Sequence, residues 1–495
     1  FGLILAFTGQ ARAGDEPKAL DLAFSLQEAF ADAIKRAEPS LVSVIRFRHR
    51  DGAVGEASLD FQVRPGLADP RRVEIRVRPD GRIDRSWSDP SDPNFVPDDF
   101  GSGVIIDPAG LILTNSHVVE NADELLVRLH NGKGLRAEIW AQDPRSDLAV
   151  LRVEATNLQP IPMGDASKVR KGHFVLSLGN PYATARDGRA SASWGIISNI
   201  ARRLPPLPLD LPPDSDEIVT LHHSATLLQT DSRLNYGTSG GALLNLKGEM
   251  IGLVTSLAAI RGFDQAAGYA IPLDESMRRI LSVLREGREV EYGFLGIQPV
   301  PVPPDPNDSD FAGRGARVRD TFEGAPAFQG GILMEDVIVA VDGIPVHDPA
   351  ELVLTVSTRF AGARVPITVV RNGKRLNLPV TLGKYPARGH IKASVRPDTW
   401  RGIRVDYATV LLINPVVGRE RLRRVPEGGV LVIEVEPDSP AAAAGIELND
   451  ILTHMGKTRV RNPAEFYEAA KKAQGKLELT WLNPQNEQKK NSVSE

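Results

Sequence analysis

Cysteine is absent from this chain of 495 residues. Its absence excludes disulfide bridges, thiolate zinc sites, iron–sulfur ligation and a cysteine nucleophile, but it does not determine the redox compartment. No apolar run reaches the roughly 18 residues that a membrane-spanning helix requires. A strong charge of one sign is also lacking, because 59 Lys and Arg stand against 63 Asp and Glu, for a formal net charge of -4. This balance disfavours general nucleic-acid binding.

The remaining composition is that of a globular protein. Apolar residues make up 42% of the chain and charged residues 25%, and a chain of this length holds about three domains. The 44 glycines and 37 prolines indicate many turns, which favours a β-rich architecture.

The N-terminus resembles the end of a secretory signal peptide. An apolar stretch at 1–9 precedes Ala11-Arg12-Ala13, which has small residues at the two positions that a signal peptidase reads. We expect residues 1–13 to be a signal-peptide remnant and the mature chain to begin after Ala13. A disordered tail, a buried strand and a retained membrane anchor are the alternatives.

Repeated short strands are expected from Leu41 to about Pro272, after a helix at Ser25–Ala37 that begins with a Ser25/Glu28 capping box. Two polar or proline-rich stretches, 49–100 and 204–216, are long enough for functional lids or disordered segments. A further helix is expected at Asp274–Glu286. The expected strands are Leu41–Phe47, Gly103–Ile106, Leu111–Thr114, Leu125–Leu129, Leu148–Val153, Phe174–Leu178, Gly195–Ile200 and Met250–Ser256.

The last 200 residues contain a weak internal repeat. Nine residues separate Ala327 from Asp336, and the same interval separates Ala441 from Asp450. Each copy continues into a helix-like stretch, at Pro349–Ser357 and Pro463–Ala473, and a closing strand. Two copies of one small α+β unit are therefore expected.

Three segments carry residues suited to acyl-transfer chemistry. His117 follows an apolar strand, Asp147 precedes Leu-Ala-Val, and Ser239 lies in a turn rich in glycine. Each segment alone has an ordinary structural explanation, but their joint occurrence in a β-rich region indicates a serine protease.

The chemistry needs each of these residue types. A serine hydroxyl becomes a good nucleophile when an imidazole takes its proton, and a carboxylate fixes the tautomer of that imidazole. Glycines let main-chain N–H groups converge on the oxyanion, where each donor contributes about 2.7–4 kcal/mol. The predicted oxyanion hole comprises Gly237, Thr238 and Ser239, with donors from Gly237 and Ser239.

These motifs resemble those of the HtrA/Deg family of serine proteases. The matching segments are 114–118, 147–150 and 237–241, and the likeness extends over nearly the whole chain. The resemblance implies a mainly β fold, with a chymotrypsin-like double β-barrel at 14–288 followed by two α+β PDZ domains at 290–385 and 396–486. It also implies that His117 is the general base, Asp147 its orienting carboxylate and Ser239 the nucleophile.

The resemblance assigns a peptide-binding role to the first PDZ domain. The carboxylate-binding loop would comprise Tyr292, Gly293, Phe294, Leu295, Gly296 and Ile297. Its backbone N–H groups would take a C-terminal carboxylate while the peptide adds as a strand. The counterpart in the second domain, Trp400–Val405, is less apolar because of Arg401 and Arg404, so a purely structural module is the alternative there.

The sequence departs from the family at four places. Thr238 stands where the family has Asn. Tyr236 stands directly before Gly237, where the family usually has either a small residue, a Pro or an Arg. The stretches 49–100 and 204–216 are enlarged, which bears on assembly and activation and not on the chemistry.

The sequence thus predicts an exported, periplasmic, ATP-independent serine endopeptidase that needs no cofactor or metal. The resemblance implies that its partners are unfolded polypeptides, C-terminal peptides and copies of itself, in a trimer or a multiple of trimers. Nucleic acid is not an expected partner, and association with a membrane is left open. The rival hypotheses are a chaperone or PDZ scaffold with a proteolytically silent barrel and, more weakly, a triad hydrolase that acts on esters.

Overall fold

The computed structural model describes residues 16–47, 99–180, 189–203, 220–224, 226–255, 268–303, 314–387, 389–413 and 428–494. These residues pack as two compact bodies. The barrel body holds the described residues of Phe1–Trp140, Leu148–Ile200 and Leu227–Arg278, and the PDZ body holds those of Ala141–Asp147, Ala201–Thr226 and Arg279–Glu495. The predicted signal remnant at 1–13, the stretch at 204–216 and nearly all of 49–100 lie outside the described residues.

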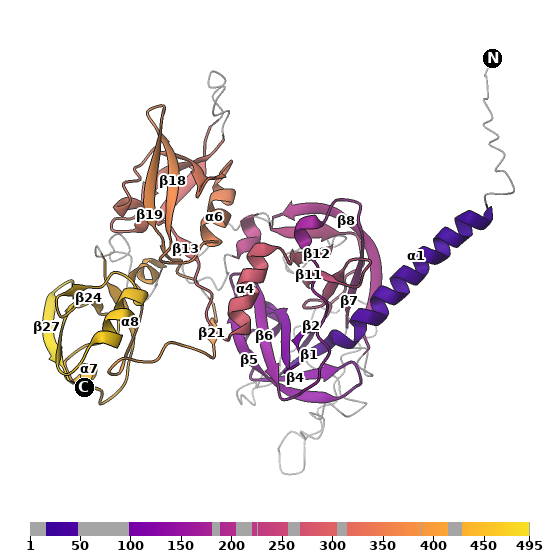
Figure 1. The fold of residues 1–495 in the computed structure, drawn as a ribbon, viewed down its shortest axis with the longest axis horizontal. Helices are drawn as coiled ribbons and strands as arrows, with labels where there is room; N and C mark the ends of the chain where they lie inside the picture. The colour runs from indigo at the N-terminus through magenta and orange to yellow at the C-terminus, as the bar shows by residue number, and fades with distance from the viewer. Residues whose placement is uncertain are drawn as a thin grey trace, which may run out of the picture. The chain divides into compact units, whose positions relative to one another are not determined.

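The first helix, α1 (Glu16–Ala37), is longer than the sequence prediction (Figure 1). The predicted capping box at Ser25 was wrong, since the Ser25 hydroxyl lies within the helix and donates to Asp21 O at 2.8 Å. Strong helix formers such as Ala19 and Leu20 extend the helix towards the N-terminus. Its end before Pro39 agrees with the prediction.

The first β-barrel is built from six strands in the order β5-β4-β1-β2-β3-β6, and pairing between β5 and β6 closes it. A short helix, α2 (Ser116–Val119), follows β3 directly. Apolar side chains from all six strands and from α2 form its core. The strands are β1 (Leu41–Phe47), β2 (Asp99–Asp107), β3 (Leu111–Asn115), β4 (Glu124–Leu129), β5 (Gly134–Asp143) and β6 (Leu148–Val153).

The second barrel is closed in the order β10-β11-β12-β9-β8-β7. The two barrels confirm the predicted chymotrypsin-like fold. The strands are β7 (Phe174–Gly179), β8 (Ser191–Arg202), β9 (Leu227–Thr230), β10 (Ala242–Leu244), β11 (Met250–Thr255) and β12 (Gly268–Pro272), and α4 (Glu275–Arg285) follows them. Among the described residues, no helix has both the length and the apolar character needed to cross a bilayer.

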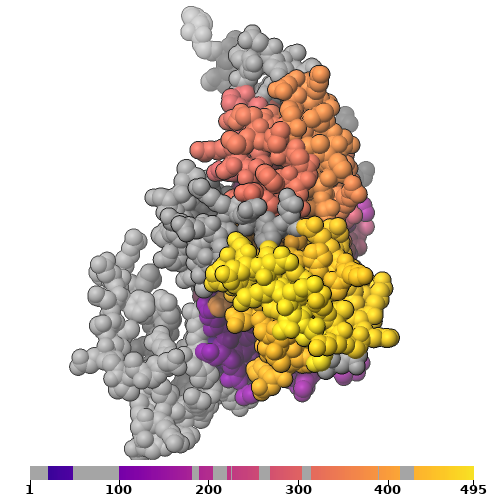
Figure 2. All heavy atoms as spheres, turned by 90° about the vertical axis from the view of Figure 1, so that its left-hand side faces the viewer, coloured from indigo at the N-terminus to yellow at the C-terminus, as the bar shows by residue number. Residues whose placement is uncertain are grey.

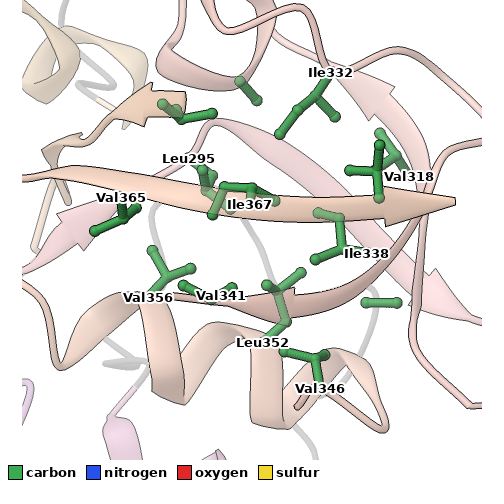
Figure 3. Close-up of a cluster of buried hydrophobic side chains, with 14 of the residues drawn as sticks. Leu295, Val318, Ile332, Ile338, Val341, Val346, Leu352, Val356, Val365 and Ile367 are labelled. Atoms are coloured by element: carbon green, nitrogen blue, oxygen red, sulfur yellow. The ribbon is translucent and has the colours of Figure 1, made fainter. Parts of the chain in front are cut away.

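The first PDZ module has a sheet in the order β14-β15-β16-β18-β19. Figure 3 shows its aliphatic core, where Leu352 and Val356 of α6 lie close to Val341 and Ile367 of the sheet. Its elements are β13 (Gly293–Phe294), β14 (Ile297–Pro301), β15 (Ala316–Thr321), α5 (Pro326–Gln329), β16 (Val337–Val341), β17 (Ile344–Pro345), α6 (Pro349–Ser357), β18 (Arg364–Arg371), β19 (Lys374–Thr381) and β20 (Gly383–Lys384).

The second PDZ module repeats this plan in the order β22-β23-β24-β26-β27. One face of it is the yellow and yellow-orange surface in Figure 2. A short strand, β21 (Lys392–Ala393), precedes it. Its elements are β22 (Ile403–Tyr407), β23 (Val430–Val435), α7 (Pro440–Ala443), β24 (Ile451–Met455), β25 (Thr458–Arg459), α8 (Pro463–Lys472), β26 (Leu477–Leu482) and β27 (Gln488–Val493).

Candidate active site

His117 lies on the short helix α2, directly after strand β3. The histidine is half-buried, and Val118 and Val119 beside it are buried in the barrel core. Arg46 of β1 donates through Nη1 to His117 O at 3.3 Å and to Glu120 O at 2.6 Å. These bonds satisfy carbonyls that a short helix leaves without partners, and they fix the position of α2.

Ser239 lies in a tight turn between β9 and β10, and it is 5% exposed. The turn places Gly237 at φ 93° and Gly240 at φ 84°, in the left-handed region where a side chain is strained. A Cβ at Gly237 would lie 2.6 Å from the Phe100 ring, and one at Gly240 would lie 2.0 Å from Ser102 O. Only glycine therefore allows this turn to approach the first barrel so closely.

Thr238 stabilises the turn internally. Its N–H donates to Asn235 O at 3.1 Å, and its hydroxyl donates to the same carbonyl at 2.7 Å. The backbone amide of Thr238 is thus engaged within the turn. Of the predicted oxyanion-hole residues, Gly237 and Ser239 supply the amides that this carbonyl does not engage.

Ser102 of β2 joins the nucleophile turn to the strand that leads to His117. Its N–H donates to Ser239 O at 2.8 Å, and its hydroxyl donates to Gly237 O at 2.7 Å. Thr114 of β3, three residues before His117, donates through Oγ1 to Ser102 O at 2.7 Å. The barrel body therefore brings the segments of His117 and Ser239 together around one buried residue.

The role of Ser102 did not emerge from the sequence analysis. The available signal was a polar residue between Gly101 and Gly103 in an otherwise apolar strand. A Cβ at Gly101 would lie 2.6 Å from Val118 and 3.2 Å from Ser239 O. The glycine is needed because the His117 helix and the nucleophile turn both pack against this point.

Asp147 lies immediately before β6 and is 3% exposed. It adopts φ 55°, a left-handed conformation that is uncommon for a residue with a side chain. The next residue, Leu148, is paired in register with Asn115 of β3, which lies two residues before His117. Strand pairing thus ties the start of β6 to the end of β3.

A buried carboxylate lies four residues before Asp147. Burial raises the pKa of Asp143, and hydrogen bonds from Ser146 and Tyr292 together with the charge of Arg145 act in the opposite direction. No group of histidine, aspartate and glutamate suited to a metal ion occurs in the described part of the chain.

The predicted carboxylate-binding loop leads into an edge strand. Leu295 is buried in the core of the first PDZ module, and Gly296 takes φ 73° just before β14. Among the residues that the structure describes, strand β14 pairs with β15 and with no other strand. Such an edge offers backbone N–H and C=O groups to an added strand. Tyr292, at the start of the loop, is fully buried instead of facing that edge.

Comparison with known proteins decides the family. Residues 101–253 match a trypsin-like peptidase domain, and residues 293–382 match a PDZ domain. A protein of Halomonas elongata named "Probable periplasmic serine endoprotease DegP-like" is 34% identical over 371 residues, which cover 74% of this chain and 73% of the relative. The chain belongs to the HtrA/Deg family of serine endoproteases.

Other members of the family are similar over most of their length. A Pseudomonas putida relative with the same name is 32% identical, with 75% of this chain and 74% of the relative covered. Among solved structures, "HtrA-type protease AlgW with decapeptide" has 27% identity and a TM-score of 0.52, and the match covers 72% of this chain and 99% of AlgW. The chain is thus a serine endopeptidase of the bacterial periplasm, as the sequence predicted.

Proposed function

We propose that His117, Asp147 and Ser239 form the catalytic triad of this endopeptidase. The strongest support comes from two hydrogen bonds that Ser102 donates to the Ser239 turn, to Ser239 O and to Gly237 O. Thr114, on the strand that precedes His117, in turn donates to Ser102 O. In this assignment the imidazole takes the Ser239 proton, the hydroxyl oxygen attacks the peptide carbonyl, and the imidazolium then protonates the leaving amine.

The oxyanion of the tetrahedral intermediate is assigned to the N–H groups of Gly237 and Ser239. Thr238 keeps these two amides in place through its bonds to Asn235 O. Asp147 holds the imidazole in the tautomer that can accept the serine proton. The reaction needs neither ATP nor a cofactor, because the acyl group passes through the serine itself.

Unfolded or misfolded exported polypeptides are the proposed substrates. An extended chain with an exposed hydrophobic C-terminus would add to the free edge of β14, with its carboxylate at the loop Tyr292–Ile297. The edge position of β14 and the left-handed turn at Gly296 support this mode of binding. The domain limits 14–288, 290–385 and 396–486 belong to the same proposal.

A homo-oligomer, a trimer or a multiple of trimers, is also proposed. An aromatic cluster supports it, because Phe30 of α1 lies 6.0 Å from Phe174 and 5.9 Å from Trp194 between ring centroids. Trp194 is 60% exposed, and Leu22 on the same helix is 73% exposed. Trp194→Ser would lower the molar mass measured by light scattering if this surface joins the subunits, and an unchanged mass would contradict that role.

The decisive test of the proposed chemistry is Ser239→Ala. We expect casein cleavage to fall by at least about 10⁴-fold, with an unchanged circular dichroism spectrum, because the nucleophile is lost. Ser282→Ala, on the exposed side of α4, serves as the control. Labelling of the wild-type protein by a fluorophosphonate, absent in Ser239→Ala, excludes a scaffold with a silent barrel, whereas undiminished proteolysis would refute the assignment.

A further inference from the structure

The segment that carries Asp147 is part of the PDZ body, although the strands on both sides of it belong to a barrel. Two of its residues, Ala141 and Gln142, pair antiparallel with Ala393 and Lys392 of β21. In the sequence, this short strand comes after the first PDZ module and before the second. The proposed catalytic carboxylate is thus attached to a segment that the PDZ body holds.

The turn at 143–147 is held by a buried hydrogen-bond network. Asp143 Oδ2 accepts from the Ser146 N–H at 3.1 Å, from the Ser146 hydroxyl at 2.5 Å, and from the Tyr292 hydroxyl. Asp147 N–H donates to Pro144 O at 3.3 Å. The left-handed conformation of Asp147 costs about 1 kcal/mol, and such strain persists only where the surroundings determine it. This network supplies those surroundings.

Arg145 occupies the centre of the same turn and is 3% exposed. Its guanidinium carbon lies 3.3 Å from the ring centroid of Tyr385 and 5.1 Å from that of Tyr292. Nη2 donates to the Ser357 hydroxyl at 2.7 Å. Nε and Nη1 have no hydrogen-bond partner in the described part of the chain, so aromatic faces hold much of this buried charge.

Burial of the Arg145 guanidinium is unfavourable for the stability of the fold. A buried cation with incomplete hydrogen bonding loses much hydration energy, and an apolar side chain of similar size would fill the site at lower cost. What the guanidinium adds is geometry, because its planar fork engages two rings and a hydroxyl at once. The backbone of the residue is held too, since Leu221 N–H donates to Arg145 O at 2.8 Å.

His222 holds the residue that precedes Asp147. It is fully buried, with Nε2 at 2.9 Å from Ser146 O and Nδ1 at 2.7 Å from the Thr226 hydroxyl. Because a carbonyl only accepts, Nε2 donates the proton in its bond to Ser146 O.

We propose that Arg145 is a positioning residue, which fixes the turn at 143–147 and thereby holds Asp147 in its left-handed conformation at the start of β6. This inference rests on the proposed function of Asp147 as the carboxylate of the triad. It makes the conformation of the proposed triad carboxylate depend on the rings of Tyr292 and Tyr385.

Arg145→Met removes the guanidinium and keeps most of the side-chain volume. We expect kcat on a small quenched peptide to fall by about 10²-fold, the effect of a displacement of about 1 Å in a catalytic group, while KM stays within about twofold. The acid limb of kcat/KM should also move to lower pH, because an imidazolium that lacks its carboxylate loses its proton more easily. Arg145→Lys, which restores the charge and not the fork, should rescue kcat in part.

Arg136→Met is the matched control, because Arg136 lies on β5, the strand that leads into the turn, and its side chain is 85% exposed beside Glu124. It should change neither kcat nor the acid limb. Titration of Ser239 with a fluorophosphonate corrects every rate for the fraction of active protein. A lower active fraction with an unmoved acid limb would show a merely structural role and overturn the proposal.

A second variant keeps the inference testable if Arg145→Met does not fold. Tyr385→Leu removes one aromatic face and leaves the guanidinium, so it should move the acid limb in the same direction and lower kcat less. An unmoved limb in that variant overturns the proposal. Failure of the triad itself is distinguished by Ser239→Ala, because retained proteolysis there refutes the chemistry whatever Arg145 does.

Discussion

The two PDZ modules share one plan around the turn that precedes their first strand. Gly296 and Gly402 both take left-handed conformations, with φ 73° and 87°. Phe322 N–H donates to Gly296 O at 3.1 Å, and Glu436 N–H donates to Gly402 O at 2.7 Å. The strands that follow, β14 and β22, are both edge strands of five-stranded paths. The backbone of the turn before β14 is therefore equivalent to that of the turn before β22.

The side chains before the glycine differ. Leu295 is buried in the first core, whereas Arg401 takes φ 50° and donates to Val493 O at 2.6 Å and to Gly475 O at 2.5 Å. Three residues earlier, Tyr292 is buried against Asp143 and Arg145, whereas Asp398 is exposed. The first loop thus contacts the segment of Asp147 through Tyr292. The second loop contacts its own module through Arg401, so equivalent backbones carry side chains with different contacts.

The largest expected effect concerns a buried lysine of the first module, one of whose two ion pairs is with Asp406 of the second module. Lys384 of β20 is 6% exposed and lies 2.7 Å from both Glu289 and Asp406. Burial acts to lower its pKa, but the charges of Asp406 and Glu289 outweigh burial and raise it. Lys384→Met would leave two partly buried carboxylates without their cation, so we expect a loss of about 3 kcal/mol of unfolding free energy, at the low end of the range for a fully buried pair.

Lys490→Met is the counterpart in the second module, where the pair with Glu478 is 56% and 48% exposed. Loss of that pair should change the unfolding free energy by less than about 0.5 kcal/mol. Urea unfolding of the full chain measures both variants. Equal losses would show that burial of the lysine does not distinguish the modules.

The next effect separates peptide binding from stability. A Cβ at Gly296 would lie 2.3 Å from Ala325 Cβ, and one at Gly402 would lie 2.1 Å from Ser439 Cβ. Gly296→Ala and Gly402→Ala should therefore destabilise their modules alike, by about 1–3 kcal/mol. Only Gly296→Ala should weaken binding of a labelled peptide with a hydrophobic C-terminus, by at least about tenfold, as measured by fluorescence anisotropy. Loss of binding in Gly402→Ala alone would move the site to the second module.

The smallest effect is a dependence of stability on pH that only the first module should show. Burial raises the pKa of Glu291, beside Tyr292, despite the nearby charge of Lys384. A carboxyl whose pKa is raised in the folded state contributes stability below its usual value of about 4.3, and that contribution is lost as pH rises through the folded value. Glu291→Gln should thus be more stable than the wild type at pH 7.5, relative to the difference at pH 4.

Urea unfolding at the two pH values checks this expectation. Glu447→Gln, at an exposed position of the second module, is the control for loss of one surface charge. A wild-type advantage at pH 7.5 that disappears at pH 4 would reverse the sign and contradict the expectation.

Much of the fold could be predicted because its strands carry strong apolar patterns. Strands β1 and β6 begin and end as predicted, and so does helix α6. Strand β5 was missed because Arg136 and Glu138 interrupt its apolar positions, and β10 was missed because its three residues are too short to form a pattern. The prediction of α1 erred at its start because a capping-box pattern inside a helix looks the same in sequence as one at its N-terminus.

The sequence by itself determined the residue types of the site and their order, because His117, Asp147 and Ser239 stand in local motifs that depend on adjacent residues. Only the tertiary structure decided that Ser102 joins the turn of Ser239 to the strand of His117, and that Arg145 lies between two tyrosines about 150 and 240 residues away. The physical reason is that such contacts arise from burial and register, which long-range packing sets and which local sequence does not encode.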